Sequence, residues 1–217
     1  DMEYRMRGPN GRWAWFRARG QVLSDDATGG QFVVAGTYEN VDEAKIEAQD
    51  KELLRTLSLR LSYLHSPEEM KEVGCALVGR RLEADYVSFV AYDAERETFL
   101  FEPHWETERV APTTVTYRQD ALPKEISAAL RDGQPFICND LSLDNPFGDH
   151  PATDVLAKRG VRAMMIVPLL HGVQCVAALV IQLAEPFYWL PREVGFCRSA
   201  LDTIWTGVER ANAETMA

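Results

Sequence analysis

Cysteine is scarce in this sequence, and its few copies lie far apart. The 217 residues contain 4 Cys: Cys75, Cys138, Cys175 and Cys197. Zinc ribbons and redox dithiols need cysteines in close pairs, so this spacing excludes both kinds of site. Cys75 and Cys197 lie in apolar helical patterns, and we therefore expect buried, reduced thiols in a cytoplasmic chain.

The short motifs that place catalytic groups are also missing. There is no Gly-x-Ser-x-Gly turn, no glycine-rich phosphate loop before a helix and no His-x-x-x-His pair. These absences exclude the common hydrolase, nucleotide-binding and zinc-enzyme motifs. We predict a chain that is not itself an enzyme and that holds no metal.

Positive charge and long apolar segments are both in short supply. Lys plus Arg number 23 against 33 for Asp plus Glu, which gives a net charge of −10 and disfavours binding to a phosphate backbone. The longest apolar run, residues 163–170, is too short to cross a bilayer, and the start lacks a signal-peptide pattern. We expect no nucleic-acid partner and no membrane contact from this segment.

Three strand-like segments come first: residues 3–7, 13–23 and 32–38. Asn10-Gly11 and Gly29-Gly30 supply hairpin turns between them, which predicts an antiparallel meander. With its Arg-rich strands, Trp15 and Gly36, this segment resembles the C-terminal part of a PAS domain. The resemblance implies that residues 1–41 are a C-terminal PAS fragment that starts partway through the domain, and we assign no ligand to it.

A long helix is predicted to follow over residues 42–66. Glycine and proline are absent until Pro67, and Asn40 stands where a helix cap is expected. The helix carries a leucine stripe: Leu54, Leu57, Leu61 and Leu64. This stripe either packs on the sheet of the next domain or forms a parallel two-chain coiled coil, and the two arrangements can coexist.

The remaining residues alternate between helical and strand patterns. Helices are predicted over residues 67–82, from residue 123 to Gly133, and over 153–159. Strand patterns cover residues 85–92, 99–104, 115–117, 136–141, 161–170 and 173–183, the last two forming a hairpin about His171-Gly172. This order predicts an α+β fold with an antiparallel sheet flanked by helices.

One segment identifies the family that this part resembles. Gly160-Val161-Arg162-Ala163, followed by Val167-Pro168-Leu169 and Gly172, is similar to the signature of GAF domains. The resemblance covers residues 52–213 and implies a GAF domain whose first helix is the second half of the linker helix. The last helix, from about residue 191 to 213, has its own apolar stripe: Val194, Cys197, Leu201, Ile204 and Val208. We expect both stripes to belong to dimer-forming, signalling helices.

The GAF resemblance also implies a ligand site between the sheet and a helix-loop region. The candidate ligand-binding residues are Phe89, His104, Trp105, Asn139, Asp140, His150 and Arg162. For the acidic loop over residues 139–150, however, a solvated surface loop without a ligand is the favoured interpretation, because such loops are normally polar. GAF pockets differ mainly in their side chains, so the cofactor is unknown.

The two resemblances imply a non-catalytic sensory region of a bacterial two-component histidine kinase, with the kinase domain downstream in the same protein. Residues 205–211 are similar to the exit helix of GAF domains in such kinases. We expect a parallel homodimer that relays the binding of a small molecule or partner. Two alternatives stay open: a GAF photoreceptor or other cofactor-binding receptor, and a methionine sulfoxide reductase that uses Cys138 and Cys175.

Overall fold

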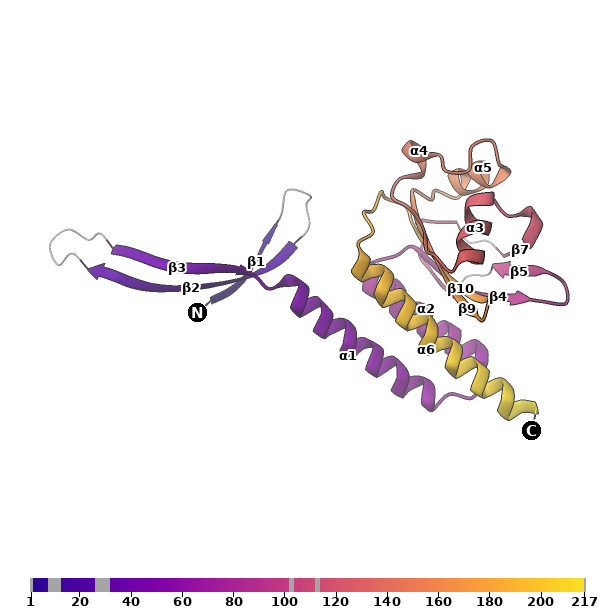
Figure 1. Cartoon of the computed structure of the whole chain (residues 1–217), viewed down its shortest axis with the longest axis horizontal. Coiled ribbons are helices and arrows are strands. Elements are labelled where there is room, and N and C mark those ends of the chain that lie inside the picture. Colours follow the sequence, from indigo (N-terminus) through magenta and orange to yellow (C-terminus); the bar gives the residue numbers. More distant parts are fainter. Residues whose placement is uncertain (1, 8–12, 26–31, 102–103, 112–113, 217) are drawn as a thin grey trace. The chain divides into compact units, whose positions relative to one another are not determined.

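A computed structural model describes the chain in five stretches: residues 2–7, 13–25, 32–101, 104–111 and 114–216. The chain divides into two compact units, Asp1–Glu52 and Leu53–Ala217, whose helices and strands are labelled in Figure 1. Helix α1 (Asp42–Ser62) contains the boundary between them. The turns predicted at Asn10-Gly11 and Gly29-Gly30 fall outside the described residues.

The first unit contains a three-stranded antiparallel sheet in the order β1-β2-β3. Its strands are β1 (Met2–Arg7), β2 (Trp13–Asp25) and β3 (Phe32–Asn40), which confirms the predicted meander. Arg17 on the central strand lies opposite Glu3 on one side and Glu39 on the other. The Arg17 guanidinium is 2.8 Å from the Glu3 carboxylate and 3.9 Å from that of Glu39, so opposite charges support this pairing.

A hydrogen bond and a cation–π contact join the first turn of α1 to this sheet. The Asp42 carboxylate accepts a hydrogen bond from the Trp15 backbone N–H (3.1 Å), and the Lys45 ammonium lies 4.3 Å from the centre of the Trp15 ring. The Val41 carbonyl accepts the first helical bond, from the Lys45 N–H (3.1 Å). β3 continues through Asn40, and Val41 is the residue that directly precedes the helix.

The second unit is built on an antiparallel sheet in the order β7-β5-β4-β10-β9-β8, with β6 paired to β4. The strands are β4 (Tyr86–Asp93), β5 (Thr98–Phe101), β6 (Trp105–Glu106), β7 (Val115–Arg118), β8 (Phe136–Cys138), β9 (Ala163–His171) and β10 (Gln174–Leu183). The central hairpin β9-β10 turns at Gly172, whose φ of +63° suits glycine. The predicted α+β architecture is thus confirmed.

Two helices, α2 (Pro67–Leu82) and α6 (Pro191–Met216), cover one face of this sheet (Figure 1). They approach closely at Gly74 of α2, where a Cβ atom would lie 2.3 Å from the Ile204 side chain of α6. Arg210 ties the second half of α1 to α6 because it donates hydrogen bonds to the carbonyls of Leu61 (2.8 Å) and Leu64 (3.2 Å). None of the described helices is both long and apolar enough to cross a membrane.

Both predicted apolar stripes lie inside this helix-covered core. Their members either belong to it or pack against it: Leu54, Leu57, Leu61, Leu64, Val194, Cys197, Leu201, Ile204 and Val208. Leu57, Leu201 and Ile204 are 0% exposed. Of the two arrangements predicted for the leucine stripe, packing within the domain is the one observed. Leu54, Leu64 and Val194 stay partly exposed, and a contact of the stripes with a second chain remains a prediction.

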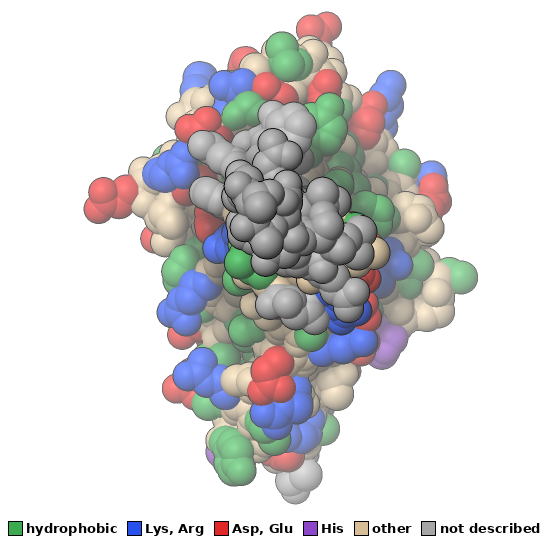
Figure 2. All heavy atoms as spheres, turned by 90° about the vertical axis from the view of Figure 1, so that its left-hand side faces the viewer, with side chains coloured by type: hydrophobic (Ala, Val, Ile, Leu, Met, Phe, Trp, Pro, Cys, Tyr) green, Lys and Arg blue, Asp and Glu red, His purple; other side chains and the backbone are tan. Residues whose placement is uncertain are grey.

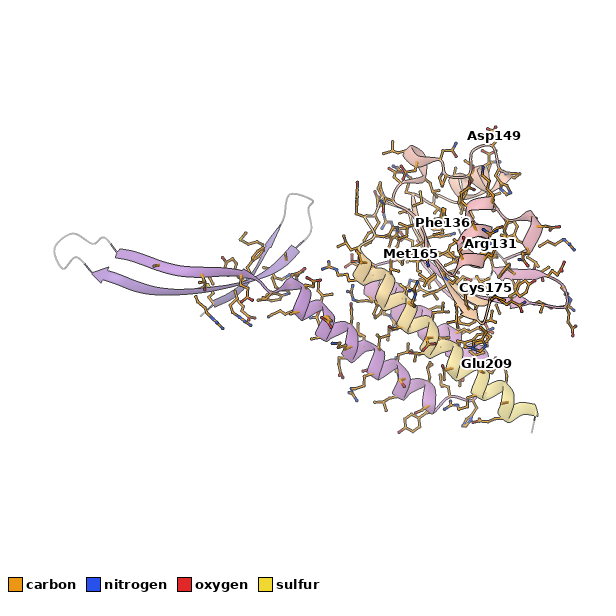
Figure 3. The ribbon with its side chains drawn as sticks, in the orientation of Figure 1. Arg131, Phe136, Asp149, Met165, Cys175 and Glu209 are labelled. Carbon is orange, nitrogen blue, oxygen red and sulfur yellow. The ribbon has the colours of Figure 1, made fainter. Side chains whose placement is uncertain are left out.

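The other face of the sheet carries three shorter helices: α3 (Lys124–Asp132), α4 (Leu141–Asp144) and α5 (Pro151–Lys158). Strand alternation separates the two faces, so that Tyr86 belongs to the core beneath α3, while Val87 and Phe89 belong to the core beneath α2 and α6. The same division holds for two residues labelled in Figure 3: Phe136 on β8 belongs to the core beneath α3, and Met165 on β9 belongs to the core beneath α2 and α6.

The strand predicted over residues 136–141 ends early, at Cys138. The Asp140 carboxylate accepts a hydrogen bond from the Ser142 N–H (3.0 Å) and so becomes the N-cap of α4. A short helix therefore replaces the end of the strand and the start of the expected loop. This cap fixes the position of Asp140 beside the sheet.

Candidate functional site

A cavity lies between the sheet and helices α3 and α5, on the face opposite to α2 and α6. Its volume is about 60 Å³, enough for a few water molecules or a small ligand, and a larger ligand would require α3 or α5 to move. Most of its wall is apolar, and it is lined by Tyr86, Phe101, Tyr117, Leu122, Pro123, Ile126, Ala152, Val155, Leu156, Arg159, Met164, Ile166, Val180 and Gln182. An apolar cavity with a few polar groups is the usual form of a small-molecule site.

Two of the polar lining residues lie directly opposite each other. Tyr86 on β4 is the register partner of Gln182 on β10, and their side chains are on the same face because both line the cavity. Tyr86 is 1% exposed and Gln182 4%. Among the described residues, neither the Tyr86 hydroxyl nor the Gln182 Oε1 atom has a hydrogen-bond partner. Buried polar atoms without partners are rare and costly, so this pair calls for an explanation.

Arg159 brings the third polar group, from the C-terminal end of α5. Its Nε donates a hydrogen bond to the Ala111 carbonyl (2.8 Å), and its guanidinium carbon lies 4.8 Å from the centre of the Tyr86 ring. Its Nη2 atom is buried and has no hydrogen-bond partner among the described residues. Burial lowers the pKa of Arg159, yet a guanidinium keeps its proton in proteins. The wall of the cavity thus carries a positive charge.

Tyr86 is a neutral hydrogen-bonding group in this setting. Burial raises the pKa of its phenol, and the nearby Ser88 hydroxyl and Arg159 charge offset only part of that effect. The Ser88 and Tyr86 hydroxyls do not meet in hydrogen-bonding geometry. Near neutral pH the phenol is therefore protonated and can donate to a ligand or accept from it.

The cavity wall offers hydrogen-bonding groups that can bind a molecule, but it lacks the side chains that commonly act as nucleophiles or as general acids and bases. No cysteine, histidine or carboxylate is among the residues that line it. Within the described part of the chain, no three His, Cys, Asp or Glu side chains converge as a metal site. On the face shown in Figure 2, basic and acidic side chains of the described residues are interspersed over the surface.

Three of the sequence-predicted ligand residues lie on the helix-covered side of the sheet. The Phe89 ring stacks on Trp205 of α6, with centroids 6.5 Å apart. The Phe89 N–H donates to His104 Nδ1 (3.3 Å), and Trp105 Nε1–H donates to the Ala84 carbonyl (3.0 Å). These contacts hold β4 against its neighbours and against α6.

The other four lie near α4 and α5. Arg162 forms a two-pronged ion pair with Asp140, from Nε to Oδ1 (3.0 Å) and from Nη2 to Oδ2 (2.8 Å). The Arg162 guanidinium, followed by the Ser142 hydroxyl, lowers the pKa of Asp140 to about 2. Asn139 accepts a hydrogen bond at Oδ1 from the Trp189 N–H (3.2 Å). His150 accepts one at Nδ1 from the Ala152 N–H (3.1 Å) and so caps α5.

The seven predicted residues are therefore not gathered around one cavity. None of them lines the cavity described above, and Arg162 lines a separate pocket beside α4 and α5. Their role in binding a ligand stays a prediction. The residues that sequence reasoning missed are Tyr86, Arg159 and Gln182. A usable signal was present for one of them, because Gln182 interrupts an otherwise apolar run over residues 175–183.

Cys138 and Cys175 do not lie on adjacent strands, as the thiol-dependent alternative assumed. Strand β9 separates β8 from β10. Cys138 pairs with Met164 and Cys175 with Leu170 along that strand, a separation of about 20 Å at about 3.3 Å per residue. Burial raises the pKa of each thiol to about 11. A disulfide between them would require a rearrangement of the sheet.

Comparison with known proteins places this fold in a family. The GAF domain family matches residues 66–208, while no curated protein matches the chain. The chromophore-binding domain of an unusual bacteriophytochrome from R. palustris is similar in structure, with a TM-score of 0.64 and 12% identity over 99% of this chain and 75% of that one.

Two further solved structures each match about three quarters of the chain. The free methionine-R-sulfoxide reductase from Neisseria meningitidis, in complex with its substrate, has a TM-score of 0.59 and 13% identity over 77% of this chain and 92% of that one. The GAF domain of a phosphoenolpyruvate-protein phosphotransferase from Coxiella burnetii has a TM-score of 0.61 and 15% identity over 77% and 97%. These likenesses concern the fold, and the family match concerns the sequence. The chain belongs to the GAF domain family, whose domain it carries at residues 66–208.

Proposed function

We propose that this chain is a sensory, regulatory region in which the GAF domain binds a small molecule in the cavity beneath α3 and α5. The observation that carries the proposal is the set of three buried polar atoms without partners among the described residues: Tyr86 hydroxyl, Arg159 Nη2 and Gln182 Oε1. A ligand that bonds to these atoms would remove their desolvation cost. The chain itself is proposed to be non-catalytic.

The sheet offers a route from this cavity to the helices on the other side. Tyr86 and Gln182 line the cavity, and their neighbours in sequence, Val87 and Ile181, lie in the core that includes Ile204 of α6. Any ligand that shifts β4 or β10 must also move side chains packed on α6, since close-packed cores transmit displacement. We propose that occupancy of the cavity alters the packing of α6 and that this change is the output.

The finer part of the proposal is that the output serves a histidine kinase in a two-component system. The resemblance of residues 205–211 to the exit helix of such kinases supports it. The N-terminal sheet is proposed to be the end of a PAS domain, which its Arg-rich antiparallel meander with Trp15 and Gly36 supports. ATP-dependent phosphorylation of a histidine in the full-length protein tests the kinase assignment, and absence of the phosphohistidine would contradict it.

A parallel homodimer is also proposed, through a surface other than the buried stripes. Leu59 and Tyr63, in and just after the last turn of α1, are 49% and 80% exposed. They give α1 a second apolar edge that the domain core leaves uncovered. A contact there would place two copies of the helix α1 beside each other.

A photoreceptor is the second candidate, because one structural neighbour is a chromophore-binding domain. The cavity of about 60 Å³ is small for a large pigment, and α5 carries no cysteine to attach one. An absorption spectrum of the freshly purified chain distinguishes the two. A visible band that changes on illumination would favour the photoreceptor over our proposal.

Retention of a small molecule by the purified chain tests the binding role. Ala152 lines the cavity, whereas Ala157 lies on the same helix, is exposed and does not line it. We expect the extract of the denatured wild-type protein to contain a small molecule, and Ala152→Leu to reduce its amount at least several-fold. Ala157→Leu should retain as much as the wild type. Equal amounts in all three proteins, or none in any after purification from its native host, would contradict the proposal.

A further inference from the structure

The cavity contains a positive charge that no negative charge of the described residues balances. The Arg159 guanidinium bonds through Nε to a backbone carbonyl, and it makes no ion pair with a carboxylate among the described residues. The face of the Tyr86 ring, 4.8 Å from the guanidinium carbon, is the described group that favours its charged form. The guanidinium is partly exposed, but its buried Nη2 atom faces the cavity without a hydrogen-bond acceptor, so the cavity is suited to an anion.

The cavity wall holds both hydrogen-bond donors and a hydrogen-bond acceptor, and together they restrict which functional groups the anion can carry. Arg159 Nη2 and the Tyr86 hydroxyl can donate, and a carboxylate accepts two such bonds at its two oxygens. Gln182 Oε1 can only accept, so it needs a hydroxyl or amino group of the ligand. Because Tyr86 and Gln182 are register partners on neighbouring strands, these groups must lie close together on the ligand.

The rest of the wall excludes a large or highly charged ligand. Around the three polar groups stand aliphatic and aromatic side chains, among them Leu122, Ile126 and Val180. The volume of about 60 Å³ admits only a few carbon atoms beyond the carboxylate, as judged from the space that one water occupies. An apolar body with a single charge fits this wall, whereas a second charge would be buried without a partner.

We propose that the cavity binds a small 2-hydroxy monocarboxylate, with its carboxylate on Arg159 and Tyr86, its hydroxyl donating to Gln182 and a short aliphatic group against the apolar wall. This inference rests on the proposed binding role of the cavity and names the class of its ligand. The three polar contacts give a partner to each of the three cavity-lining atoms that have none within the described chain: the Tyr86 hydroxyl, Arg159 Nη2 and Gln182 Oε1.

Three related compounds separate the contributions of charge and hydroxyl. The probes are 2-hydroxyisovalerate, isovalerate, which lacks the hydroxyl, and 2-hydroxyisovaleramide, which lacks the charge. Binding to the full chain, freed of any retained ligand, is measured by isothermal titration calorimetry. We expect the amide to bind at least about tenfold more weakly than the hydroxy acid, and isovalerate about five- to tenfold more weakly, since each loses a buried hydrogen bond or ion pair.

Variants assign these differences to residues. Arg159→Met should abolish the advantage of the acid over the amide, while Arg131→Met, an exposed arginine of α3 whose guanidinium pairs with Asp132, should leave it unchanged. Gln182→Leu should make 2-hydroxyisovalerate and isovalerate bind equally. If Arg159→Met does not fold, Gln182→Leu and Tyr86→Phe still test the proposal, because each removes only one polar contact.

Several outcomes would overturn the inference without touching the proposed function. Equal binding of acid and amide, both blocked by Ala152→Leu, would show a cavity that binds ligands without selecting a carboxylate. Inorganic phosphate that competes as well as the hydroxy acid would show a general anion site. If no probe binds, the ligand class is wrong, and the small-molecule extract of the wild type and Ala152→Leu proteins then decides separately whether the cavity binds anything.

Discussion

Tyr86 and Gln182 lie directly opposite each other on β4 and β10, and each carries a buried polar atom without a hydrogen-bond partner among the described residues. Gln182 lies between Ile181 and Leu183 of β10, whereas Tyr86 is the first residue of β4 and lies between Asp85 and Val87. Such a pair lowers the stability of the ligand-free domain, since each buried polar atom has lost its hydrogen bonds to water without gaining one in the fold. The same pair provides specific contacts once a ligand is present.

Replacing Gln182 by leucine should stabilise the ligand-free domain. Gln182→Leu removes a buried oxygen that has no described partner while it keeps a similar volume, so we expect the free energy of unfolding to rise by about 1 kcal/mol. Urea unfolding followed by circular dichroism measures it. Gln134→Leu, an exposed position, serves as the control and should change the value by less than about 0.5 kcal/mol. A loss of stability on Gln182→Leu would mean that the amide has a partner in the fold.

The Asp140–Arg162 pair should make stability depend on pH in the acid range. The pKa of Asp140 is lowered to about 2 from an ordinary value of 3.8, so its contribution is fully present above about pH 4 and is lost as the pH falls towards 2. We expect Asp140→Asn to remove this part of the acid dependence. Asp149→Asn, at an exposed carboxylate labelled in Figure 3, is the control.

Titration of the carboxyl carbon by NMR checks the same pair directly. In the wild type Asp140 should titrate near pH 2, and in Arg162→Met its pKa should move up towards the ordinary range, because the guanidinium is the largest cause of the shift. An Asp140 signal that titrates near pH 4 in the wild type would contradict the ion pair.

The contact between α2 and α6 at Gly74 should be intolerant of even one methyl group. A Cβ there would lie 2.3 Å from Ile204, and we expect Gly74→Ala to cost about 1–3 kcal/mol of stability. Gly195→Ala is the matched control: that glycine is in α6 with nothing within 4 Å of its Cβ position, so alanine should stabilise by about 0.5–1 kcal/mol. Denaturant unfolding compares the two variants.

A double-mutant cycle then tests the identity of the contact. Ile204→Ala alone leaves a cavity and should cost about 2–5 kcal/mol. Combined with Gly74→Ala it should cost clearly less than the sum, since the new methyl group enters the space that the isoleucine leaves. Additive costs would show that the two residues do not touch.

The buried stripes and the exposed edge of α1 should respond differently to a charge. Leu201 is 0% exposed, so Leu201→Glu should unfold the domain, because an unpaired buried carboxylate is not tolerated. The double variant Leu59→Glu/Tyr63→Glu should leave the domain folded and shift a dimer to monomer in analytical ultracentrifugation. A folded monomer from the wild type at high concentration would refute the dimer.

Local signals in the sequence were enough to predict most of the elements. Hairpin residues and strand alternation indicated the three strands of residues 2–40 and the β9-β10 hairpin, and Ser66-Pro67 indicated the start of α2, where the Ser66 hydroxyl accepts a bond from the Glu69 N–H. The GAF resemblance supplied the order of the remaining elements. The leucine stripe was visible too, but its two possible partners were not distinguishable from spacing alone.

The site could not be predicted in the same way, because it depends on pairings between distant segments. Tyr86 and Gln182 are almost a hundred residues apart, and only the register of β4 against β10 brings them together. Arg159 looked like the end of a short helix, and nothing local shows that its Nη2 atom turns inwards. His150 and Asp140 looked like ligand residues because they are polar and lie in a loop, yet each caps a helix.

The central claim is that occupancy of the cavity changes the packing of α6, on the other face of the sheet. Hydrogen–deuterium exchange of α6, measured by mass spectrometry in Ala152→Leu and Ala157→Leu, tests it most directly because it needs no knowledge of the ligand. Filling the cavity with Ala152→Leu should change exchange several-fold in β4, β10 and residues 197–208, and Ala157→Leu should not. Exchange in α6 that stays the same in both variants, while β4 and β10 respond to Ala152→Leu, would contradict the relay.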